Sequence, residues 1–340
     1  MKALIFSEIN QMALQDVEVP GIAADEVLIK MRSCGICHSD FELLSGKYII
    51  PFSYPITPGH EWAGEVVKVG DKVTQYQVGD RVVGECVIGC GTCPTCNSGD
   101  FSYCPNANHF GFTINGADAE YFVARPEWLH KIPGNLSWKT AALIEPFCVA
   151  YYSLDIQGGV DASETVVVLG GGNIGLLTLA AAKGMGARTV LVEPTPFRQD
   201  IARQLGVDYV INPITENAVE RVLELTGSEG ADLVVEASGN SEALKSTFDL
   251  VKNSGKITFT GINIGQEIPI ELGKIQIKGL QIRGVIGSPY VWDRAIRFLS
   301  QTKLDLSPIV THQFSLSEAV EAFEVAHTEK NSIKIQILND

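Results

Sequence analysis

The chain has 340 residues, of which 45% are hydrophobic, and a formal net charge of −14 from 40 acidic and 26 basic residues. This length suggests two domains, and the hydrophobic content is enough for a large core. The acidic balance argues against nucleic acid as a partner, because phosphate contacts need clustered Lys and Arg. The first residues contain no apolar run typical of a signal peptide, so we predict a cytoplasmic protein, in which stable disulfides are rare.

The first 150 residues are rich in short segments with the two-residue period of strands. Examples are EVLIKM at 26–31 and GEVVKVG at 64–70, and turns such as Gly70-Asp71 separate such segments. Continuous helical patterns are few in this part of the chain. We therefore predict a β-rich first domain.

Four of the eight cysteines fall within fifteen residues, in ECVIGCGTCPTCNSGDFSYC at 85–104. They are Cys90, Cys93, Cys96 and Cys104, with the spacing C-x2-C-x2-C-x7-C. Four thiolates on tight turns can complete a tetrahedral zinc shell without an open position, which is typical of a structural site. A disulfide pairing and an iron–sulfur cluster are the alternatives. A DNA-binding zinc finger is excluded, because the region has no histidine pair and no basic helix beside it.

The long uncharged stretch TVVVLGGGNIGLLTLAAA at 165–182 has the length of a membrane span. Its three consecutive glycines and its asparagine favour a strand, a turn and a helix instead, so we predict no membrane contact. Gly170, Gly172 and Gly175 satisfy G-x-G-x-x-G directly after the strand, which is the pattern of a dinucleotide-binding fold. The first glycine would make the tight turn, the second would let a pyrophosphate approach, and the third would let the helix pack closely on the sheet.

The start of the following helix, at Asn173 and Ile174, would offer unpaired N–H groups to the phosphates of the cofactor. Glu193 follows the second strand, eighteen residues after the last of these glycines. A carboxylate there accepts hydrogen bonds from the adenosine ribose and repels a 2′-phosphate, which favours NAD over NADP. Arg198 is the counter-argument, because a nearby arginine could hold that phosphate or pair with Glu193.

The alternation of strands and helices continues to about residue 286. Further strand patterns occur at 207–212, 231–238, 255–261 and 280–287. Helical patterns between them occur at 197–205, 216–225 and 241–251. Six strands with crossovers make a doubly wound parallel sheet, so we predict an α/β domain over 155–286. The tail, 287–340, has two amphipathic helical patterns and a terminal strand.

Three separate segments carry residue types that bind metals: SCGICHSDFE at 33–42, PGHEWAG at 58–64 and ALIEPFCVAYY at 142–152. The candidate ligands in them are Cys37, His60, Glu61 and Glu145. No spacing rule links these residues, since a fold can assemble a site from distant segments. Each also has a purely structural interpretation, such as a buried thiol or a hydrogen-bonded core histidine. The remaining cysteines lie in apolar surroundings and are predicted to be core thiols: Cys34, Cys86 and Cys148.

Six motifs occur in order along the chain: GICHSD, GHEWAGEVVKVG, the four-cysteine region, GADAEY, IEPF and VLGGGNIG. Together they resemble the zinc-dependent medium-chain dehydrogenase/reductase family, within it the sorbitol and threonine dehydrogenase-like branch, which includes polyol and polyol-phosphate dehydrogenases. The resemblance covers essentially the whole chain. It implies a GroES-like catalytic domain at 1–154 with a structural zinc lobe at about 86–106. A Rossmann NAD-binding domain at 155–286 and a C-terminal segment at 287–340 that returns to the catalytic domain would follow.

By position, the resemblance implies that Cys37, His60, Glu61 and Glu145 hold a catalytic zinc, so that each chain carries two zinc ions. The mixed ligand set could also admit manganese or cobalt. Zinc would lower the pKa of a substrate hydroxyl. A secondary hydroxyl of a polyol, polyol phosphate or sugar acid would then be oxidised to a ketone, with hydride transfer to NAD. The resemblance also implies a homodimer or homotetramer.

Further roles follow from the same resemblance. Ser39 occupies the position of a proton-relay hydroxyl, Asp40 that of the acid which orients the histidine ligand, and His38 a position that reaches the cofactor pyrophosphate. Two residues depart from the family pattern. Many relatives have histidine at Glu42, where it passes the relay proton to solvent, and an aromatic residue is common at Asp118. The proton could instead leave through Glu42 itself or through the glutamate ligand and water.

Two alternative functions stay open at this point. A general alcohol or 2,3-diol dehydrogenase would share the fold, although Glu145 in place of a cysteine argues against the simple alcohol branch. A non-catalytic NAD-binding redox sensor would keep only the zinc of the four-cysteine region. Metal content separates these hypotheses, because the sensor needs one zinc per chain and the enzyme two.

Overall fold

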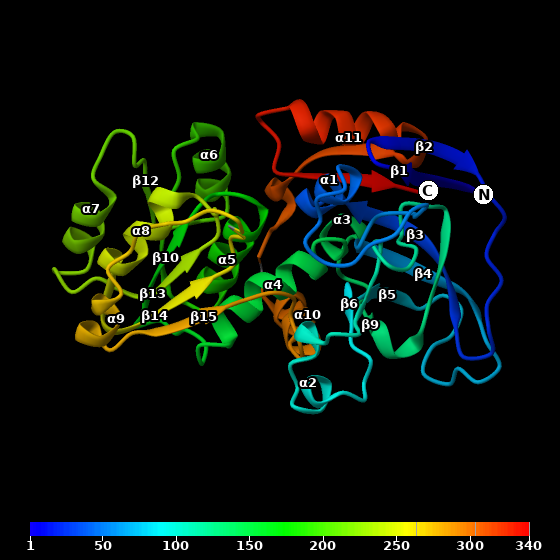
Figure 1. The fold of residues 1–340 in the computed structure, drawn as a ribbon, viewed down its shortest axis with the longest axis horizontal. Coiled ribbons are helices and arrows are strands. Elements are labelled where there is room, and N and C mark those ends of the chain that lie inside the picture. The colour runs from blue at the N-terminus through cyan, green and yellow to red at the C-terminus, as the bar shows by residue number, and fades with distance from the viewer. Residues whose placement is uncertain (263, 303, 340) are drawn as a thin grey trace. The chain divides into compact units, whose positions relative to one another are not determined.

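A computed structural model describes residues 1–262, 264–302 and 304–339. The chain divides into two compact units, each described here by itself (Figure 1). The first unit comprises Met1–Glu145, Trp292–Gln301 and Val310–Asp340. The second unit comprises Pro146–Val291 and Thr302–Ile309.

These boundaries differ from the divisions after residues 154 and 286 that the sequence suggests. The first boundary falls inside helix α4 (Ile144–Asp155), between Glu145 and Pro146, and no glycine-rich linker marks it. The second lies at residue 291, and 302–309 then returns to the second unit. Sequence composition therefore locates the first boundary between the two units only to within about ten residues, because helix α4 runs across that boundary without a break.

The second unit is built on a six-stranded parallel sheet with the strand order β12-β11-β10-β13-β14-β15. Its strands are β10 (Thr165–Leu169), β11 (Arg188–Val192), β12 (Tyr209–Ile211), β13 (Ala231–Glu236), β14 (Val251–Phe259) and β15 (Gln281–Gly284). The order runs outward from β10 on one side and from β13 on the other. This is the doubly wound dinucleotide-binding architecture, and it confirms the predicted six-stranded sheet.

Helices cover both faces of this sheet. They are α5 (Asn173–Gly184), α6 (Pro196–Gln204), α7 (Ala218–Leu225), α8 (Ser241–Leu250) and α9 (Gly273–Lys278). Helix α5 packs on β10 and β11 and against α6, whereas α8 packs on β13 and β14 and against α7. Figure 1 shows these two groups on opposite sides of the strands. A short 3-10 turn, η3 (Ser307–Ile309), also belongs to this unit.

Local chemistry explains where these elements begin. Asn217 is the N-cap of α7, and its side-chain oxygen accepts hydrogen bonds from the backbone N–H groups of Val219 and Glu220 at 3.1 and 3.3 Å. The helix therefore starts two residues later than the predicted 216. The uncharged stretch at 165–182 forms β10, a turn and most of α5, as predicted. No helix among the described residues combines the length and apolar character that crossing a bilayer requires.

The first unit is β-rich, as predicted. Its main sheet has the order β16-β17-β3-β4-β5-β9, and β8 also pairs with β3. These strands are β3 (Val27–Gly35), β4 (Glu61–Val69), β5 (Arg81–Gly84), β8 (Tyr121–Ala124), β9 (Leu129–Lys131), β16 (Val310–Ser315) and β17 (Lys334–Leu338). Two small sheets pair β1 (Lys2–Glu8) with β2 (Gln11–Asp16), and β6 (Val87–Ile88) with β7 (Asn108–His109).

Short helices connect these strands. The α-helices are α1 (His38–Leu44), α2 (Pro94–Asn97), α3 (Trp138–Ala141), α10 (Trp292–Gln301) and α11 (Ala319–Thr328). The 3-10 turns are η1 (Phe101–Tyr103), η2 (Pro126–Trp128) and η4 (Leu316–Glu318). The core between these elements contains Trp62, which packs with Phe122 at a ring-centroid distance of 4.7 Å.

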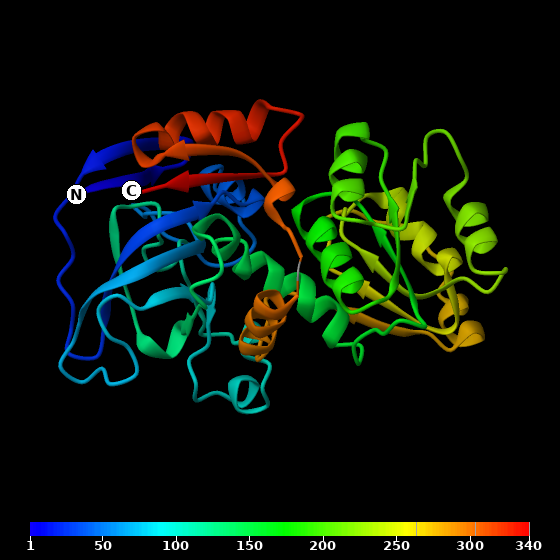
Figure 2. The same ribbon diagram turned by 180° about the vertical axis from the view of Figure 1, so that it is seen from behind.

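The C-terminal strand completes the first unit. Strand β17 pairs antiparallel with β3, so that Gln336 lies opposite Gly35, and parallel with β16. Figure 2 shows this red strand between the orange β16 and the blue β3. The last residues of the chain thereby reach the end of β3, two residues before Cys37.

Candidate functional site

Cys37 is the N-cap of α1, directly after β3. Its backbone N–H donates a hydrogen bond of 2.8 Å to Oδ2 of Asp40, which is fully buried. The other carboxylate oxygen, Oδ1, lies 3.5 Å from Nδ1 of His60. One aspartate thus holds two of the predicted ligand residues, and this orientation leaves Nε2 of His60 to face a metal.

His60 precedes β4, and Glu61 is its first residue. One potential ligand atom from each of Cys37, His60 and Glu61 can be chosen so that all three lie within 4.8 Å of one another. We call this group the Cys37 site. Gly35 lies opposite Glu61 in the β3–β4 pairing, and a Cβ atom there would be only 2.5 Å from Oε2 of Glu61. Glycine at this position leaves room for the carboxylate.

The donor atoms fit a zinc ion, which thiolate, imidazole and carboxylate groups bind together. His60 and Glu61 are only 5% and 2% exposed, so their donor atoms lie out of solvent. Burial lowers the pKa of His60, but the charges of Cys86 and Asp40 outweigh it, so that the pKa is raised. Burial raises the pKa of Glu145 to about 7. The charge of His60 lowers this pKa, and the charge of Glu61 raises it further. The raised pKa of His60 indicates a negative environment that favours a bound cation.

Glu145 stands in the first turn of α4 and is 9% exposed. The charges of His60 and Glu61 act on its pKa, so it lies near the Cys37 site. It is not a member of the group whose ligand atoms approach within 4.8 Å, which in the described part of the chain has three residues. The structure thus brings Cys37, His60 and Glu61 together, and the fourth predicted ligand, Glu145, lies outside this group.

Lys334 is a site residue that the sequence did not indicate. Its Nζ lies 2.5 Å from Oε2 of Glu61 and donates a hydrogen bond of 2.8 Å to the backbone carbonyl of Ile36. Its side chain is only 3% exposed. Burial is the largest single influence and lowers the pKa of Lys334, but Glu61 and the other nearby negative groups together outweigh it, so that the pKa is raised. In SIKIQIL, Lys334 has the pattern of a solvent-facing strand residue, so the sequence did not predict this buried ion pair.

Three further residues discussed with the resemblance lie on α1, and Asp118 lies elsewhere in the first unit. His38 is exposed in the first turn of α1, whereas Ser39 and Glu42 on the same helix are partly buried. Asp118 is buried, its Oδ1 has no hydrogen-bond partner in the part of the chain that the structure describes, and burial raises its pKa to about 7.

Cys86 packs against the core of the first unit, as predicted for a core thiol, but it is less buried than the other two predicted core thiols. Cys34 and Cys148 are fully buried, but Cys86 is only partly buried. Burial raises the pKa of Cys86 to about 12; the charge of His60 opposes this rise, and the charge of Glu145 adds to it. Its thiol therefore lies in the electric field of the Cys37 site. An apolar neighbourhood in sequence did not reveal this, because the β6–β7 pairing determines where residue 86 lies.

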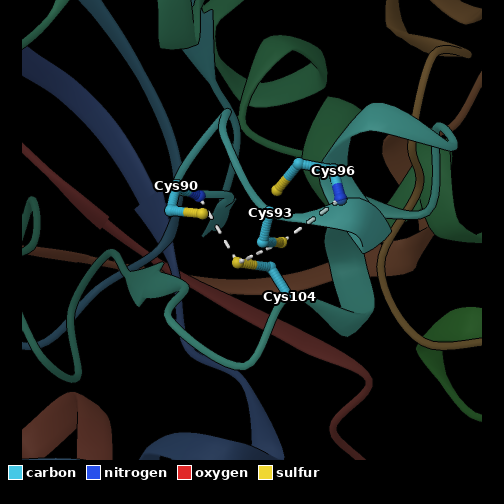
Figure 3. Close-up of side chains that lie close together, drawn as sticks. All are labelled: Cys90, Cys93, Cys96 and Cys104. Atoms are coloured by element: carbon cyan, nitrogen blue, oxygen red, sulfur yellow. Dashed lines mark hydrogen bonds between the residues drawn. The ribbon is translucent and has the colours of Figure 1, made fainter.

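The four closely spaced cysteines converge, as Figure 3 shows. Their sulfur atoms all lie within 4.8 Å of one another. Sγ of Cys104 accepts a hydrogen bond of 3.4 Å from the backbone N–H of Cys90 and lies 3.7 Å from Sγ of Cys93. The backbone N–H of Cys96 donates to Sγ of Cys93 at 3.4 Å. All eight cysteines are free thiols, so the arrangement is that of a four-thiolate metal site.

The thiols of this cysteine lobe, residues 86–106, differ in how readily they ionise. Backbone and side-chain hydrogen bonds from Thr92 lower the pKa of Cys90 to about 6. Burial, together with the neighbouring thiols, raises the pKa of Cys96 to about 12. Cys90 thus ionises readily whereas Cys96 keeps its proton, and a bound zinc ion would stabilise all four sulfurs as thiolates.

The glycine-rich turn after β10 has the geometry of a nucleotide site. Gly170 has φ of +101°, and a Cβ atom on Gly175 would come within 1.9 Å of the carbonyl oxygen of Gly170. A Cβ atom on Gly172 would meet nothing within 4 Å, so packing within the chain does not require glycine there. Asn173 begins α5, with Ile174 next, and the buried Oδ1 of Asn173 has no hydrogen-bond partner among the described residues. These features fit a pyrophosphate approaching the helix start.

Glu193 follows β11 and is 2% exposed. Its Oε2 accepts a hydrogen bond of 2.6 Å from the N–H of Gly171, and its Oε1 one of 2.8 Å from the N–H of Thr195. Nη1 of Arg198 lies 4.0 Å from Oε2. The carboxylate is thus anchored to the glycine turn, and the arginine faces the same carboxylate.

Comparison with known proteins agrees with this fold and these sites. Residues 23–134 match the alcohol dehydrogenase GroES-like domain, and residues 173–301 match the zinc-binding dehydrogenase domain. The chain is 33% identical to sorbitol dehydrogenase of Bacillus subtilis (strain 168), over 99% of this chain and 97% of that protein. It is 32% identical to D-arabitol-phosphate dehydrogenase of Enterococcus avium, over 96% and 94%.

A solved structure from Sinorhizobium meliloti 1021, described as a zinc-binding dehydrogenase bound to NADP, matches with a TM-score of 0.93. That chain is 29% identical, and the match covers 99% of both chains. Fold, sites and relatives together define a zinc-binding dehydrogenase. The chain belongs to the zinc-dependent medium-chain dehydrogenase family and is an oxidoreductase, which confirms the resemblance seen in its sequence.

Proposed function

We propose that this enzyme oxidises a secondary hydroxyl of a polyol, polyol phosphate or sugar acid to a ketone and transfers the hydride to NAD. The Cys37 site is the observation that carries this proposal, because a thiol, an imidazole and a carboxylate converge in a buried, negative environment. The relatives named for sorbitol and D-arabitol phosphate support the substrate class. A general alcohol or 2,3-diol dehydrogenase is the second candidate, which the structure of 2R,3R-butanediol dehydrogenase from Bacillus subtilis favours at 29% identity.

Two metal sites per chain belong to the same proposal. Cys37, His60 and Glu61 would hold the catalytic zinc, and Glu145, whose pKa responds to the charges of His60 and Glu61, would join them directly or through water. When bound, this zinc supplies a Lewis acid that lowers the pKa of a substrate hydroxyl. The four thiols of the cysteine lobe would hold a structural zinc, since they leave no open coordination position.

The residues of the chain then have distinct tasks. Asp40 orients His60 through Nδ1 and holds the backbone of Cys37, which keeps both ligands in place. Lys334 holds the carboxylate of Glu61 beside the site. The hydroxyl of Ser39, two residues after Cys37, would accept the proton of the substrate hydroxyl and pass it on. Glu42 on the same helix or the carboxylate of Glu145 would receive it next.

NAD is proposed over NADP on the basis of Glu193. A buried carboxylate at the end of β11 would accept hydrogen bonds from the adenosine ribose and repel a 2′-phosphate. Arg198 lies 4.0 Å from that carboxylate, which supports pairing with Glu193 as its role. The relative that binds NADP makes a direct comparison of the two cofactors necessary. A cytoplasmic location and a homodimeric or homotetrameric assembly stay predictions from the sequence.

The test is NAD and NADP reduction against a panel of polyols, polyol phosphates, sugar acids and simple alcohols. Metal-stripped protein, with zinc or manganese added back, serves as the control. Turnover of a polyol-type compound that disappears on stripping and returns with metal is the expected result. Protein that holds two metal ions and binds NAD but oxidises none of these compounds would refute the proposed substrate class. Protein that retains a single metal ion would support the redox-sensor alternative.

A further inference from the structure

Glu236 is the last residue of β13 and is fully buried. It lies opposite Leu169, the last residue of β10, and the backbone N–H of Ala237 donates a hydrogen bond of 2.9 Å to the carbonyl of Leu169. The strand order reverses between β10 and β13. Ligands of a doubly wound sheet bind at the carboxyl ends of the strands at this point of reversal. Glu236 therefore stands at the edge of the sheet where the cofactor is expected.

The carboxylate of Glu236 holds the turn between β13 and α8. Its Oε1 accepts hydrogen bonds from the backbone N–H and the hydroxyl of Ser238 at 2.8 and 2.5 Å. The backbone N–H of Gly239 donates to both carboxylate oxygens, at 3.1 and 3.2 Å. A Cβ atom on Gly261, which follows β14, would clash with Oε2 of Glu236, so glycine there leaves room for the carboxylate. Burying a carboxylate is unfavourable without such hydrogen bonds, and those to a charged acceptor are strong.

The turn that Glu236 holds packs against the glycine-rich turn after β10. A Cβ atom on Gly170 would lie only 2.8 Å from Cβ of Ser238 and 3.1 Å from its backbone N. The hydroxyl of Ser238 also accepts a hydrogen bond of 3.1 Å from the backbone N–H of Asn240, the N-cap of α8. Residues 237–239 thus border the glycine-rich turn on the β13 side, and Glu236 fixes where they lie.

Glu193 has the corresponding position on the other side of β10. It follows β11, is also buried, and its Oε2 accepts a hydrogen bond of 2.6 Å from the N–H of Gly171. A doubly wound sheet consists of two mononucleotide-binding halves. Strands β10 to β12, with Glu193, form the half proposed to bind the adenosine. Strands β13 to β15, with Glu236, form the half that remains for the nicotinamide nucleoside.

We propose that Glu236 positions the nicotinamide half of the bound cofactor by holding residues 237–239 beside the glycine-rich turn. The glutamate acts through this turn and does not itself contact the cofactor, so it is a positioning residue. This inference rests on the proposed use of NAD and adds a residue to that cofactor site. The adenosine half should bind independently of Glu236, because the hydrogen bond from Gly171 to Glu193 holds the glycine-rich turn from the other side.

The test compares the binding of NAD and ADP to the metal-loaded enzyme by isothermal titration calorimetry. ADP shares the adenosine and both phosphates of NAD but lacks the nicotinamide riboside. Glu236→Gln keeps the size of the side chain and removes the charged acceptor. We expect the Kd of NAD to rise by about 10- to 50-fold and that of ADP to change by less than about threefold. In steady-state kinetics, KM for NAD should rise more than KM for the oxidised substrate.

Three further variants sharpen the comparison. Asp232→Asn is the matched control, because Asp232 lies near the other end of β13, where its Oδ2 accepts a hydrogen bond of 2.7 Å from the N–H of Thr165. It should leave both Kd values within about twofold of wild type. Glu193→Gln should weaken NAD and ADP alike. Ser238→Ala removes only one hydrogen bond to Glu236 and should raise the Kd of NAD by about two- to fivefold.

Equal weakening of NAD and ADP in Glu236→Gln, or unchanged binding of NAD, would overturn the inference. If Glu236→Gln does not fold, Ser238→Ala decides, and wild-type affinity for NAD in that variant would overturn the inference. Wild-type enzyme that binds neither NAD nor ADP would overturn the proposed cofactor itself. Wild-type enzyme that binds NAD but oxidises no polyol would overturn the proposed substrate class alone, because the binding comparison uses no substrate.

Discussion

The cysteine lobe and the Cys37 site are built in opposite ways. The lobe takes its four sulfurs from fifteen consecutive residues, and backbone N–H groups of the same segment hydrogen-bond to two of them. The Cys37 site takes its ligands from the start of α1 and the start of β4. Lys334, near the end of the chain, pairs with the carboxylate of Glu61 in this site. Ile36 and Lys334, which meet beside it, are 298 residues apart.

This difference predicts how each site responds to damage. A locally wrapped site depends on its own turns, so losing it should disturb mainly its own segment. A site assembled across a sheet depends on strand pairing, so its supporting residues also contribute to the stability of the whole unit. Substitutions at matched positions can separate these two behaviours.

Cys37→Ser should have the largest effect on activity. Because the thiolate is a central ligand, we expect kcat/KM to fall by about 10³-fold or more. The protein should lose one of two bound metal ions, while its melting temperature changes little. Metal analysis and steady-state kinetics measure both effects. Activity close to wild type would contradict the assignment of the Cys37 site as catalytic.

Cys104→Ser should show the reverse pattern. Structural zinc contributes folding free energy, so removing one of its four thiolates should lower the melting temperature by about 5–10 °C. The catalytic metal should remain bound, with kcat/KM at low temperature within about threefold of wild type. Calorimetry and limited proteolysis of residues 86–106 check this. An equal loss of activity in Cys104→Ser and Cys37→Ser would show that the two sites are not independent.

Lys334→Met tests the support that arrives from the far end of the chain. It would leave the carboxylate of Glu61 buried without its ion-pair partner, which costs about 3–5 kcal/mol in the free energy of unfolding. Adding Glu61→Gln should recover part of that loss, because no charge is then left unpaired. The exposed Lys330→Met is the matched control and should change the unfolding free energy by less than about 0.5 kcal/mol. Denaturant unfolding measures all four proteins.

Substitution of His130 should have the smallest effect on the free energy of unfolding. This residue contacts side chains that are distant in sequence, and no metal site is involved. Its Nε2 lies 3.0 Å from Oε1 of Glu85 and its Nδ1 lies 3.1 Å from Oδ1 of Asp293, while its ring stacks on Trp292 at 5.0 Å. Burial lowers the pKa of His130, but the hydrogen bonds and charges of the two carboxylates outweigh it and raise the pKa. The protonated ring therefore helps to hold the start of α10 in the first unit.

A raised pKa in the folded state means that this contribution is fully present below the unfolded value of about 6.5. It is lost as the pH rises through the folded value. We expect about 0.5–1 kcal/mol, since Asp293 is largely exposed. The difference in unfolding free energy between wild type and His130→Gln, measured from pH 5.5 to 9, should shrink as the pH rises. A difference that does not depend on pH would refute an ionic role for His130.

Several features followed from the sequence because they depend on residues close together in the chain. The spacing of Cys90, Cys93, Cys96 and Cys104 predicted their convergence, and the run from Thr165 to Glu193 predicted the strand, turn and helix in order. Helix ends were misplaced by one or two residues, as at α7, because the cap residue and not the hydrophobic period decides the start.

Sequence by itself thus determined the doubly wound sheet and the cysteine lobe, since local turns and periodicity encode them, and the resemblance of its ordered motifs to a known family indicated the dehydrogenase class. Tertiary structure alone decided the placement of Lys334 against Glu61 and of Cys86 in the field of His60. These depend on which strands pair and in which register, as when β17 joins β3 and carries Lys334 to the end of that strand. A residue pair separated by hundreds of positions leaves no pattern in one sequence, because the pairing is a property of the folded sheet.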